Sequence, residues 1–365
     1  MTASAQTPSE QCPDTKVDTG PIKFQNVNGA HVISAFVNSV PVKAIIDTGA
    51  PDTVLSVEFL EKLQDKIKIM DSVGVRGDKL KIAKIVVGIG KIGVRSNVRV
   101  ENLSDVRQAL PGIDLIISPS LINCYNLNLS NDNNYIKITS IINRVGFKHI
   151  KLTQDRYYYF VNAKIAKNLK LILDTGFNGE ISLNSSPNIE KVLGHPLTTV
   201  ASATTTGVEI SKIYKGRKIQ IGEMYIYAPH VELFEKRNDV FSDYDGLIGA
   251  RFLDQYNYII DFRKKDLWLS PRATPAPAEP RKTAGLLGFP DGQGGFQVGH
   301  VMIHSPAEAA GFKTGDRVCA IDGKPIGNDF FATDAHNWGT DKPGKTSIIT
   351  MCDARVRTID QKYFY

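Results

Sequence analysis

Two aspartate-threonine-glycine triplets stand out as residues able to carry chemistry, Asp47-Thr48-Gly49 and Asp174-Thr175-Gly176. Each triplet follows an apolar run, residues 44–46 before the first and residues 171–173 before the second. A carboxylate at the end of a buried strand is costly unless it is paired or protonated. Two such carboxylates in one chain predict a pair that shares a proton and activates water. The alternative is that both triplets are plain turns, because Asp and Gly favour turns.

An internal repeat positions the two triplets, and a search for repeats comes first when motifs are duplicated. The matched segments occur in the same order in both halves of the chain: residues 36–47 with 160–174, 114–121 with 245–253, and 125–129 with 256–261. The second carboxylate therefore occupies the place of the first in a second copy of the same unit.

The segments around the triplets read mostly as strands. Residues 32–37 and 80–87 are β-branched or alternate between apolar and polar side chains, as half-buried strands do. Helical patterns are short, at residues 57–63 and 104–109. The pattern predicts a mostly β fold with one or two helical turns in each half.

Over about residues 21–270, the chain resembles the retropepsin-like and pepsin-like aspartic proteases. The first triplet with Ala50, followed by Asp52-Thr53-Val54-Leu55, is most similar to the retropepsin form. The resemblance implies a two-lobed acid-protease-like β-barrel architecture, with lobe one at residues 21–142 and lobe two at residues 143–272. A disordered tail is expected at residues 1–20.

The resemblance also implies roles for the triplet residues. Asp47 and Asp174 would form the catalytic dyad, which needs no metal and no cofactor. Gly49 and Gly176 allow the tight turn after each aspartate. Thr48 and Thr175 would cross-link the lobes through the backbone, and the alternative for each is a plain strand residue.

Three departures from the family pattern affect the expected site. Ala50 and Phe177 stand where pepsin-like enzymes carry a hydroxyl that favours the charged carboxylate, so the dyad pKa values should be raised. Activity is therefore expected at mildly acidic to neutral pH. Ser118 replaces the expected glycine after residues 116–117, which weakens the expected support of the site in lobe one. The bulk of Phe177 is expected to narrow the cleft or to mark the second half as atypical.

Two glycine-containing segments are flap candidates, meaning hairpins that would close over a substrate. The first contains Gly74 and Gly77, and the second contains Thr206 and Gly207. The alternative for each segment is an ordinary hairpin turn.

The C-terminal region reads as a separate module. A Pro/Ala-rich linker at residues 273–283 precedes Ser305-Pro306-Ala307-Glu308-Ala309-Ala310-Gly311 and Thr314-Gly315-Asp316-Arg317-Val318. Residues 284–365 resemble a bacterial-type PDZ domain, a β-sandwich with short helices that binds a peptide C-terminus by adding a strand to a sheet edge. The resemblance places the peptide-binding cradle at Leu286, Leu287, Gly288 and Phe289. The alternative is a structural or autoregulatory appendage.

Composition and charge exclude several other classes of protein. The 365 residues carry a net charge of +6 with no Lys/Arg block, so we expect no nucleic-acid partner. No run of 18 apolar residues occurs, so no membrane span is expected. Residues 88–93 match the spacing of a dinucleotide-binding loop, but a strand-like segment follows where that site needs a helix. The seven histidines show no metal-ligand spacing.

The termini and cysteines bear on the compartment. Ala3-Ser4-Ala5-Gln6 looks like a cleavage site left after a signal peptide, which favours a periplasmic or secreted protein, and an ordinary tail is the alternative. The four cysteines, Cys12, Cys124, Cys319 and Cys352, make no disulfide framework. Cys319 and Cys352 are able to pair within one small domain, but reduced, buried thiols are the expectation.

The sequence therefore predicts an aspartic endopeptidase of two lobes with a PDZ domain that recruits substrate or regulates access. The expected partners are a polypeptide substrate and a peptide C-terminus. One chain holds both aspartates, so a monomer suffices. The rival hypothesis is a peptide-binding scaffold whose dyad has decayed, and a second alternative is hydrolysis of small peptides or esters.

Overall fold

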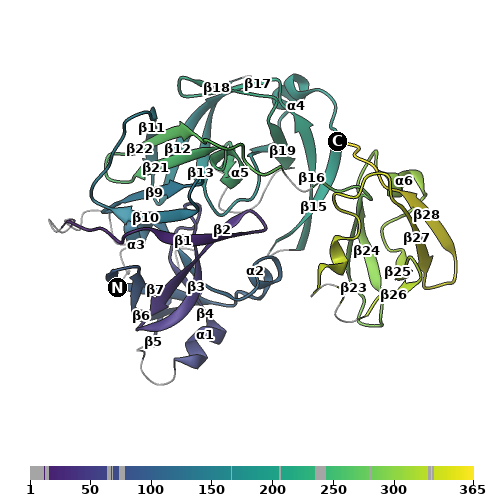
Figure 1. The fold of residues 1–365 in the computed structure, drawn as a ribbon, viewed down its shortest axis with the longest axis horizontal. Coiled ribbons are helices and arrows are strands. Elements are labelled where there is room, and N and C mark those ends of the chain that lie inside the picture. Colours follow the sequence, from purple (N-terminus) through teal and green to yellow (C-terminus); the bar gives the residue numbers. More distant parts are fainter. Residues whose placement is uncertain are drawn as a thin grey trace. The chain divides into compact units, whose positions relative to one another are not determined.

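The computed structural model describes residues 12, 16–63, 67, 69–73, 79–165, 167–204, 207–234, 244–278, 281–327, 330 and 333–365. Strands dominate this part of the chain, and its longest α-helix, α4 (Pro187–Leu193), has only 7 residues. The expected mostly β fold is confirmed (Figure 1). Within the same ranges, no helix combines the length and the apolar character that crossing a membrane requires.

An antiparallel sheet joins the two repeats, and each repeat contributes three of its described strands. The strand order is β1 (Ile22–Val27), β10 (Tyr135–Thr139), β9 (Asn126–Ser130), β21 (Tyr256–Asp261), β22 (Asp266–Pro271) and β11 (Lys148–Asp155). At its centre, Asn128 of β9 lies opposite Ile259 of β21. These two residues are also equivalent in the repeat, so an approximate twofold axis passes through the pair.

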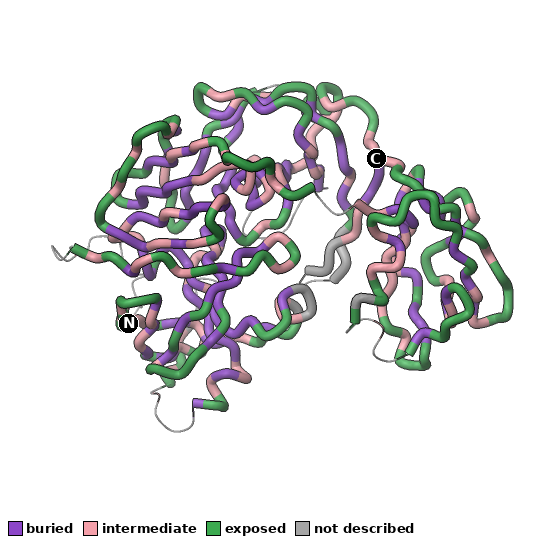
Figure 2. Tube along the Cα trace, viewed as in Figure 1, coloured by how far each residue is buried: buried purple, intermediate pink, exposed green. Residues whose placement is uncertain are grey.

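The first repeat forms a second sheet in which one strand lies between two others. β8 (Ile113–Ile117) runs parallel to β3 (Val40–Ile46) and antiparallel to β4 (Val54–Ser56). The remaining strands of this sheet are β2 (Ala30–Val37), β5 (Ile69–Val73), β6 (Lys79–Ile89) and β7 (Ile92–Glu101). Strand β3 ends in three buried residues, and β8 is buried along almost its whole length (Figure 2). Strands that are covered on both faces have apolar runs of sequence, as these two strands do.

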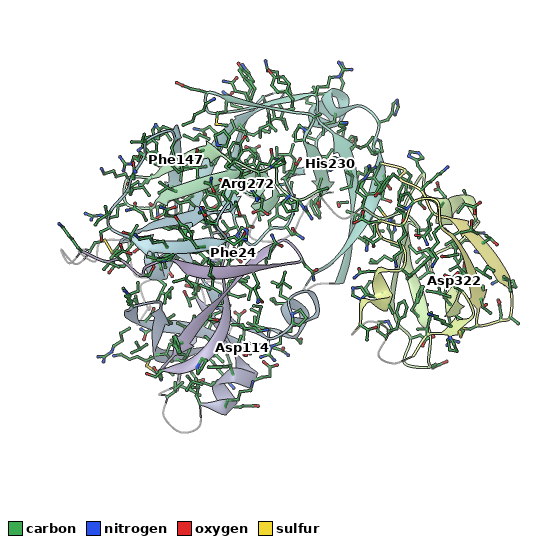
Figure 3. All side chains as sticks on the ribbon, in the orientation of Figure 1. Phe24, Asp114, Phe147, His230, Arg272 and Asp322 are labelled. Atoms are coloured by element: carbon green, nitrogen blue, oxygen red, sulfur yellow. A yellow bond between two sulfur atoms is a disulfide. The ribbon has the colours of Figure 1, made fainter. Side chains whose placement is uncertain are left out.

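Asp114 is a carboxylate buried in β8, and its partners make it structural. Asp114, labelled in Figure 3, accepts a hydrogen bond from Ser56 Oγ at 2.7 Å and forms an ion pair with Arg107. Arg107 also donates to the carbonyl of Ile113 at 3.1 Å. A paired, hydrogen-bonded charge is the form in which a carboxylate is tolerated inside a protein.

The second repeat builds the same arrangement. β20 (Gly246–Gly249) runs parallel to β13 (Asn168–Asp174) and antiparallel to β14 (Ile181–Asn184). The other strands of this repeat are β12 (Tyr158–Lys164), β15 (Thr198–Thr204), β16 (Gly207–Lys215), β17 (Lys218–Ile221), β18 (Met224–Tyr227) and β19 (His230–Phe234).

The helices are short and several begin at a capping serine. The expected helices at residues 57–63 and 104–109 correspond to α1 (Val57–Lys62) and α2 (Ser104–Ala109). The others are α3 (Pro119–Ile122), α4, α5 (Ala250–Leu253) and α6 (Pro306–Ala309). Ser56, Ser186 and Ser305 each accept a backbone hydrogen bond in the first turn, which satisfies a donor that the helix leaves free.

The C-terminal module has its own sheet and core. The sheet order is β23 (Leu286–Pro290), β24 (Phe296–Val301), β25 (Arg317–Ile321), β27 (Thr346–Met351) and β28 (Val356–Asp360), with β26 (Lys324–Pro325) beside β25. A short 3-10 helix, η2, spans Asp334–Asn337. The fully buried side chains in the core of the module include Val298, Val318, Ile349 and Ile359.

The chain divides into two compact units that differ from the expected lobes. One unit comprises Met1–Asn184, Lys218–Pro229 and Arg237–Ala276, and the other comprises Ser185–Arg217, His230–Lys236 and Pro277–Tyr365. The C-terminal module is thus grouped with α4, β15, β16 and β19 of the second repeat.

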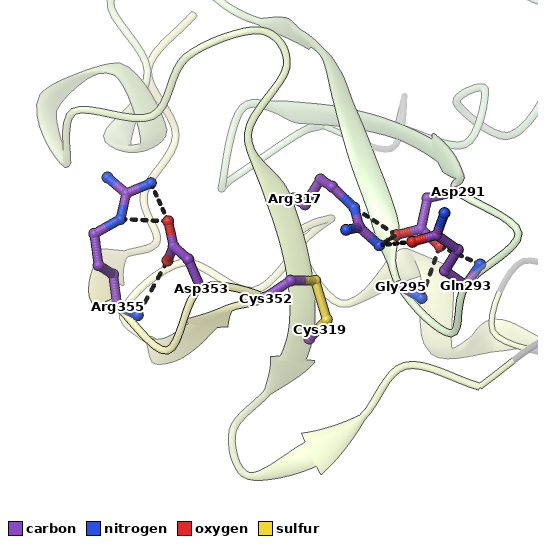
Figure 4. Close-up of a disulfide and its surroundings, with 8 residues drawn as sticks. All are labelled: Asp291, Gln293, Gly295, Arg317, Cys319, Cys352, Asp353 and Arg355. Carbon is purple, nitrogen blue, oxygen red and sulfur yellow. Dashed lines mark hydrogen bonds and ion pairs between the residues drawn. A yellow bond between two sulfur atoms is a disulfide. The ribbon is translucent and has the colours of Figure 1, made fainter.

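The expectation of reduced cysteines is wrong, because both pairs form disulfides. Cys319 lies on β25, and Cys352 follows directly after β27. Because Val318 of β25 lies opposite Met351 of β27, the Cα atoms of the two cysteines are only 4.9 Å apart (Figure 4). Cys12 is bonded to Cys124, with 5.3 Å between their Cα atoms.

The expected disordered tail does not extend through residue 20. Thr19 N donates to the carbonyl of Ile138 at 3.0 Å, and Ser140 N donates to that of Val17 at 2.9 Å. Asp18 forms a bridge with Thr139 at the end of β10. These backbone bonds anchor residues 17–19 just before β1.

Candidate functional site

The two aspartates stand at equivalent strand ends. Asp47 follows β3, and Asp174 is the last residue of β13. The neighbouring parallel strand holds each end: Asp47 N donates to the carbonyl of Ile117 at 2.9 Å, and Asp174 lies opposite Gly249 of β20. The chain therefore turns sharply at a point where the backbone is fixed on one side.

The structure brings the two carboxyl groups together across the twofold axis. A Cβ atom added to Gly49 would lie 2.4 Å from Cγ of Asp174, and one added to Gly176 would lie 2.4 Å from Cγ of Asp47. Each carboxyl group thus packs directly over the glycine of the opposite triplet. Only glycine leaves room for this approach.

The two threonines cross-link the triplets in a reciprocal way. Thr48 N donates to Thr175 Oγ1 at 3.1 Å, and Thr175 N donates to Thr48 Oγ1 at 3.0 Å. Each hydroxyl then donates onward, from Thr48 to the carbonyl of Leu173 at 2.6 Å and from Thr175 to that of Ile46 at 2.7 Å. Four buried hydrogen bonds therefore fix the two strand ends against each other, and neither threonine is a plain strand residue.

Backbone N–H groups donate hydrogen bonds to both carboxyl groups. Gly49 N donates to Asp47 Oδ1 at 2.8 Å, and Gly176 N donates to Asp174 Oδ1 at 2.8 Å. Phe177 N adds a bond to Asp174 Oδ1 at 3.0 Å. Ala50 and Phe177 carry no side-chain donor.

Burial raises the pKa of both aspartates. For Asp47 this effect exceeds the opposing hydrogen bonds from Asp174 and from the N–H groups of Gly49, Ala50 and Gly176, which favour its charged form. For Asp174, burial, the charge of Asp47 and the hydrogen bond with it raise the pKa well above the usual value. The pair therefore keeps one proton over a wide pH range, since two charges this close do not both form readily.

The two repeats support the aspartate pair with different residues. The ring of Phe177 and the backbone oxygen of Gly179 both lie against Gly249, where an added Cβ would be 2.5 Å from Phe177 Cδ1. In the first repeat, Ala50 replaces the phenylalanine and Ser118 replaces the glycine. Ser118 is fully buried, and its N–H donates to Thr53 Oγ1 at 3.2 Å. The large residue Phe177 after the second triplet is thus accompanied by Gly249 at the end of the neighbouring strand. The small residue Ala50 after the first triplet is accompanied by Ser118 at the equivalent position.

Phe177 is half-buried, and its ring packs within the second repeat. Phe177 and Tyr244 pack against a buried cluster formed by Tyr158, Phe160, Ile172 and Leu247.

Tyr158 is a residue near the dyad that the sequence analysis did not single out. It is buried, and its ring makes an edge contact with Tyr244 at 5.7 Å between centroids. Burial, then the nearby charges of Tyr244, Asp174 and Asp47, raise the pKa of Tyr158 to about 12, so it stays a neutral phenol. Strand register places it where the first repeat has Ala30, and this break in the repeat was the available signal.

The expected flap segments lie mostly beyond the described residues. Gly74, Gly77 and Thr206 fall outside them. Gly207 is described: it begins β16 and pairs with Thr204, the last residue of β15.

The expected peptide cradle forms strand β23. Leu286, Leu287, Gly288 and Phe289 are half-buried and pair with β24, with a register shift between Leu287 and Gly288. In the described part of the chain, no second strand pairs with β23, which makes it an edge of its sheet. Edge strands present backbone groups that are able to pair with an added chain.

Two comparisons with known proteins found no match: no family model fits the chain, and no curated protein is similar to it. Among the described residues, no three His, Cys, Asp or Glu side chains gather as metal ligands. Function is therefore inferred from the residues themselves.

Proposed function

We propose that this chain is an aspartic endopeptidase in which Asp47 and Asp174 activate a water molecule for attack on a peptide bond. The observation that supports this most is their facing geometry, with each carboxyl group packed over the glycine of the opposite triplet. The threonine cross-link supports it further, because it holds both carboxyl groups on rigid strand ends.

The reaction follows from one shared proton. The ionised carboxylate accepts a proton from the water as its oxygen attacks the scissile carbonyl carbon, while the protonated partner donates to the carbonyl oxygen. Proton transfer to the leaving nitrogen then allows the C–N bond to break. The proton belongs to the pair, so neither aspartate is assigned a fixed role.

The substrate in this proposal is an extended polypeptide, held by the two lobes and their hairpins. Both aspartates come from one chain, which supports a site formed within a monomer. Tyr158, a neutral phenol close to the pair, is a further group that a bound peptide would meet.

The C-terminal module is proposed to be a PDZ domain that binds a peptide C-terminus along β23. Three features support this: the edge position of the strand, its half-buried apolar side chains and the short helix α6 that begins at Ser305. Such a domain would recruit substrates or regulate access to the dyad.

A periplasmic or secreted location is part of the proposal. Disulfides persist in oxidising compartments and are rare where thiols are kept reduced. The bonds Cys12–Cys124 and Cys319–Cys352 support this location.

The decisive experiment is mass spectrometry of the products formed from a broad peptide library. Wild type is expected to cleave internal peptide bonds, and a pepstatin-type inhibitor to block the reaction. Asp47→Asn and Asp174→Asn should each reduce kcat/KM by at least about 100-fold, the lower range of what positioned acid–base groups contribute. Asp52→Asn, which changes a nearby aspartate outside the pair, is the matched control.

A library left intact by wild type and both variants would instead favour the scaffold hypothesis. Cleavage confined to small esters or dipeptides would favour the small-substrate alternative. Cleavage retained in Asp47→Asn would contradict the dyad itself.

A further inference from the structure

The β15–β16 hairpin is a continuous ladder that ends at a predicted flap. Its pairing runs without a register shift from Thr198 opposite Ile213 to Thr204 opposite Gly207. In chain order it follows α4 and is the counterpart of β5–β6, which follows α1 in the first repeat.

The base of this hairpin is hydrogen-bonded to the C-terminal module. Thr198 Oγ1 donates to the carbonyl of Ile303 at 2.8 Å, and Ile303 N donates to Thr199 Oγ1 at 3.2 Å. Thr199 Oγ1 also lies 2.8 Å from His300 Nε2. His304 Nδ1 lies 3.0 Å from the carbonyl of Leu197. Both partners belong to the same compact unit.

These contacts are buried, which distinguishes them from casual surface contacts. Thr198 is fully buried, and Thr199 and His300 are only 8% and 7% exposed. Leaving a buried donor or acceptor unpaired is unfavourable, so the contact favours one arrangement of hairpin and module. Burial also lowers the pKa of His300, which keeps its ring neutral beside the threonine hydroxyl.

The residues that contact the base of the hairpin lie directly beside β23, the predicted peptide-binding strand. His300 lies directly opposite Leu287 in the pairing of β23 with β24. Met302 N, next to Ile303, donates to the carbonyl of Gly285 at 2.9 Å. A peptide added to the edge of β23 would therefore contact the strand that pairs with His300, and His300 in turn contacts Thr199 of the hairpin.

We propose that a peptide C-terminus bound along β23 shifts the β15–β16 hairpin through the Thr199–His300 contact and so sets the rate of peptide cleavage. This inference rests on the proposed function, and it gives the PDZ-like module a regulatory role in addition to any recruiting role. A bound peptide has this effect because it favours one arrangement of the contact over another, and such couplings typically change a rate or affinity about 5–150-fold.

The test uses the full chain and a defined probe. The probe is a fluorescein-labelled decapeptide that ends in Val-Leu-Val with a free carboxylate, and its C-terminal amide is the control. Fluorescence anisotropy measures binding, hydrogen exchange of residues 198–204 measures the hairpin, and kcat/KM on a separate internal substrate measures cleavage. Exchange is recorded in Asp47→Asn, which cannot consume the probe.

Thr199→Val removes the hydroxyl at constant shape, and Thr199→Ser retains it. The exposed threonine Thr346 provides a matched control as Thr346→Val. We expect the acid probe, but not the amide, to change exchange in the hairpin and to change kcat/KM at least about fivefold. Thr199→Val should keep the probe affinity within about twofold and lose both responses, while Thr199→Ser and Thr346→Val respond as wild type does.

The outcomes separate this inference from the proposed function. Probe binding without any change in exchange, or a normal response in Thr199→Val, overturns the coupling. Absence of probe binding removes the peptide site and the coupling with it. Absence of cleavage alone overturns the endopeptidase, while exchange in the hairpin still decides the coupling.

Discussion

Ala50 and Phe177 leave both carboxyl groups with backbone donors in place of a side-chain hydroxyl. A hydroxyl donor would favour the charged form, so its absence adds to the effect of burial, which raises both pKa values. The active pair must lose one of its two protons. A raised pKa moves that loss to higher pH, so cleavage should peak at mildly acidic to neutral pH.

Ala50→Ser tests this reasoning, because it offers Asp47 a hydroxyl. The acid limb of the pH profile of kcat/KM should move to lower pH, while Ala50→Gly, which adds no donor, should leave it in place. A wild-type optimum near pH 3 would contradict the expectation.

The raised pKa of Asp174 also predicts how stability depends on pH. The folded protein holds this proton more tightly than the unfolded chain, so the stability is fully present below the usual aspartate pKa and is lost as pH rises through the folded value. Asp174→Asn removes this loss. Its Tm should exceed that of wild type at pH 7 and match it near pH 3, with roughly 2–4 °C for each kcal/mol recovered. An equal Tm difference at both pH values would argue against it.

At the level of the elements, Phe177 and Gly249 depend on each other. Gly249→Ser would place Cβ against the backbone oxygen of Gly179 as well as 2.5 Å from Phe177 Cδ1, and it should lower the free energy of unfolding by about 1–3 kcal/mol. Phe177→Ala relieves only the contact with the ring. Phe177→Ala with Gly249→Ser reproduces the Ala50 and Ser118 combination of the first repeat. A double-mutant cycle by urea denaturation should show a favourable coupling of about 0.5–3 kcal/mol. Strict additivity would mean that the two positions are independent.

The sequence predicted the strand ends well because apolar runs and triplets are local signals. The pairing of Asp47 with Asp174 followed from the repeat, since equivalent places meet at a twofold axis. Tyr158 escaped prediction because its approach to the dyad depends on the register of β12 with β13. The inward packing of Phe177 depends on Gly179 and Gly249, whose effect appears only once the strands are placed.

For the whole molecule, we expect the two disulfides to increase the free energy of unfolding. The bonds close segments of 112 and 33 residues, for which loop closure in the unfolded chain predicts about 5 and 4 kcal/mol. Dithiothreitol should therefore lower the Tm of wild type. The matched variants Cys12→Ser and Cys319→Ser should each reproduce part of that loss.

Thiol counting provides the direct check on the disulfides. The protein unfolded without reductant should expose no free thiol, and after reduction it should expose four, the number of cysteines in the chain. Four reactive thiols before reduction would restore the original expectation of reduced cysteines.

The pairing of Asn128 with Ile259 has a consequence for the origin of the chain. Because equivalent residues face each other there, either repeat made alone would expose β9 or β21 to the same strand of a second copy in the same register. We therefore expect separately expressed halves to form homodimers, each with two identical triplets. A single chain that holds both copies is free of that symmetry requirement, so the second copy is able to hold Phe177 and Gly249 while the first holds Ala50 and Ser118.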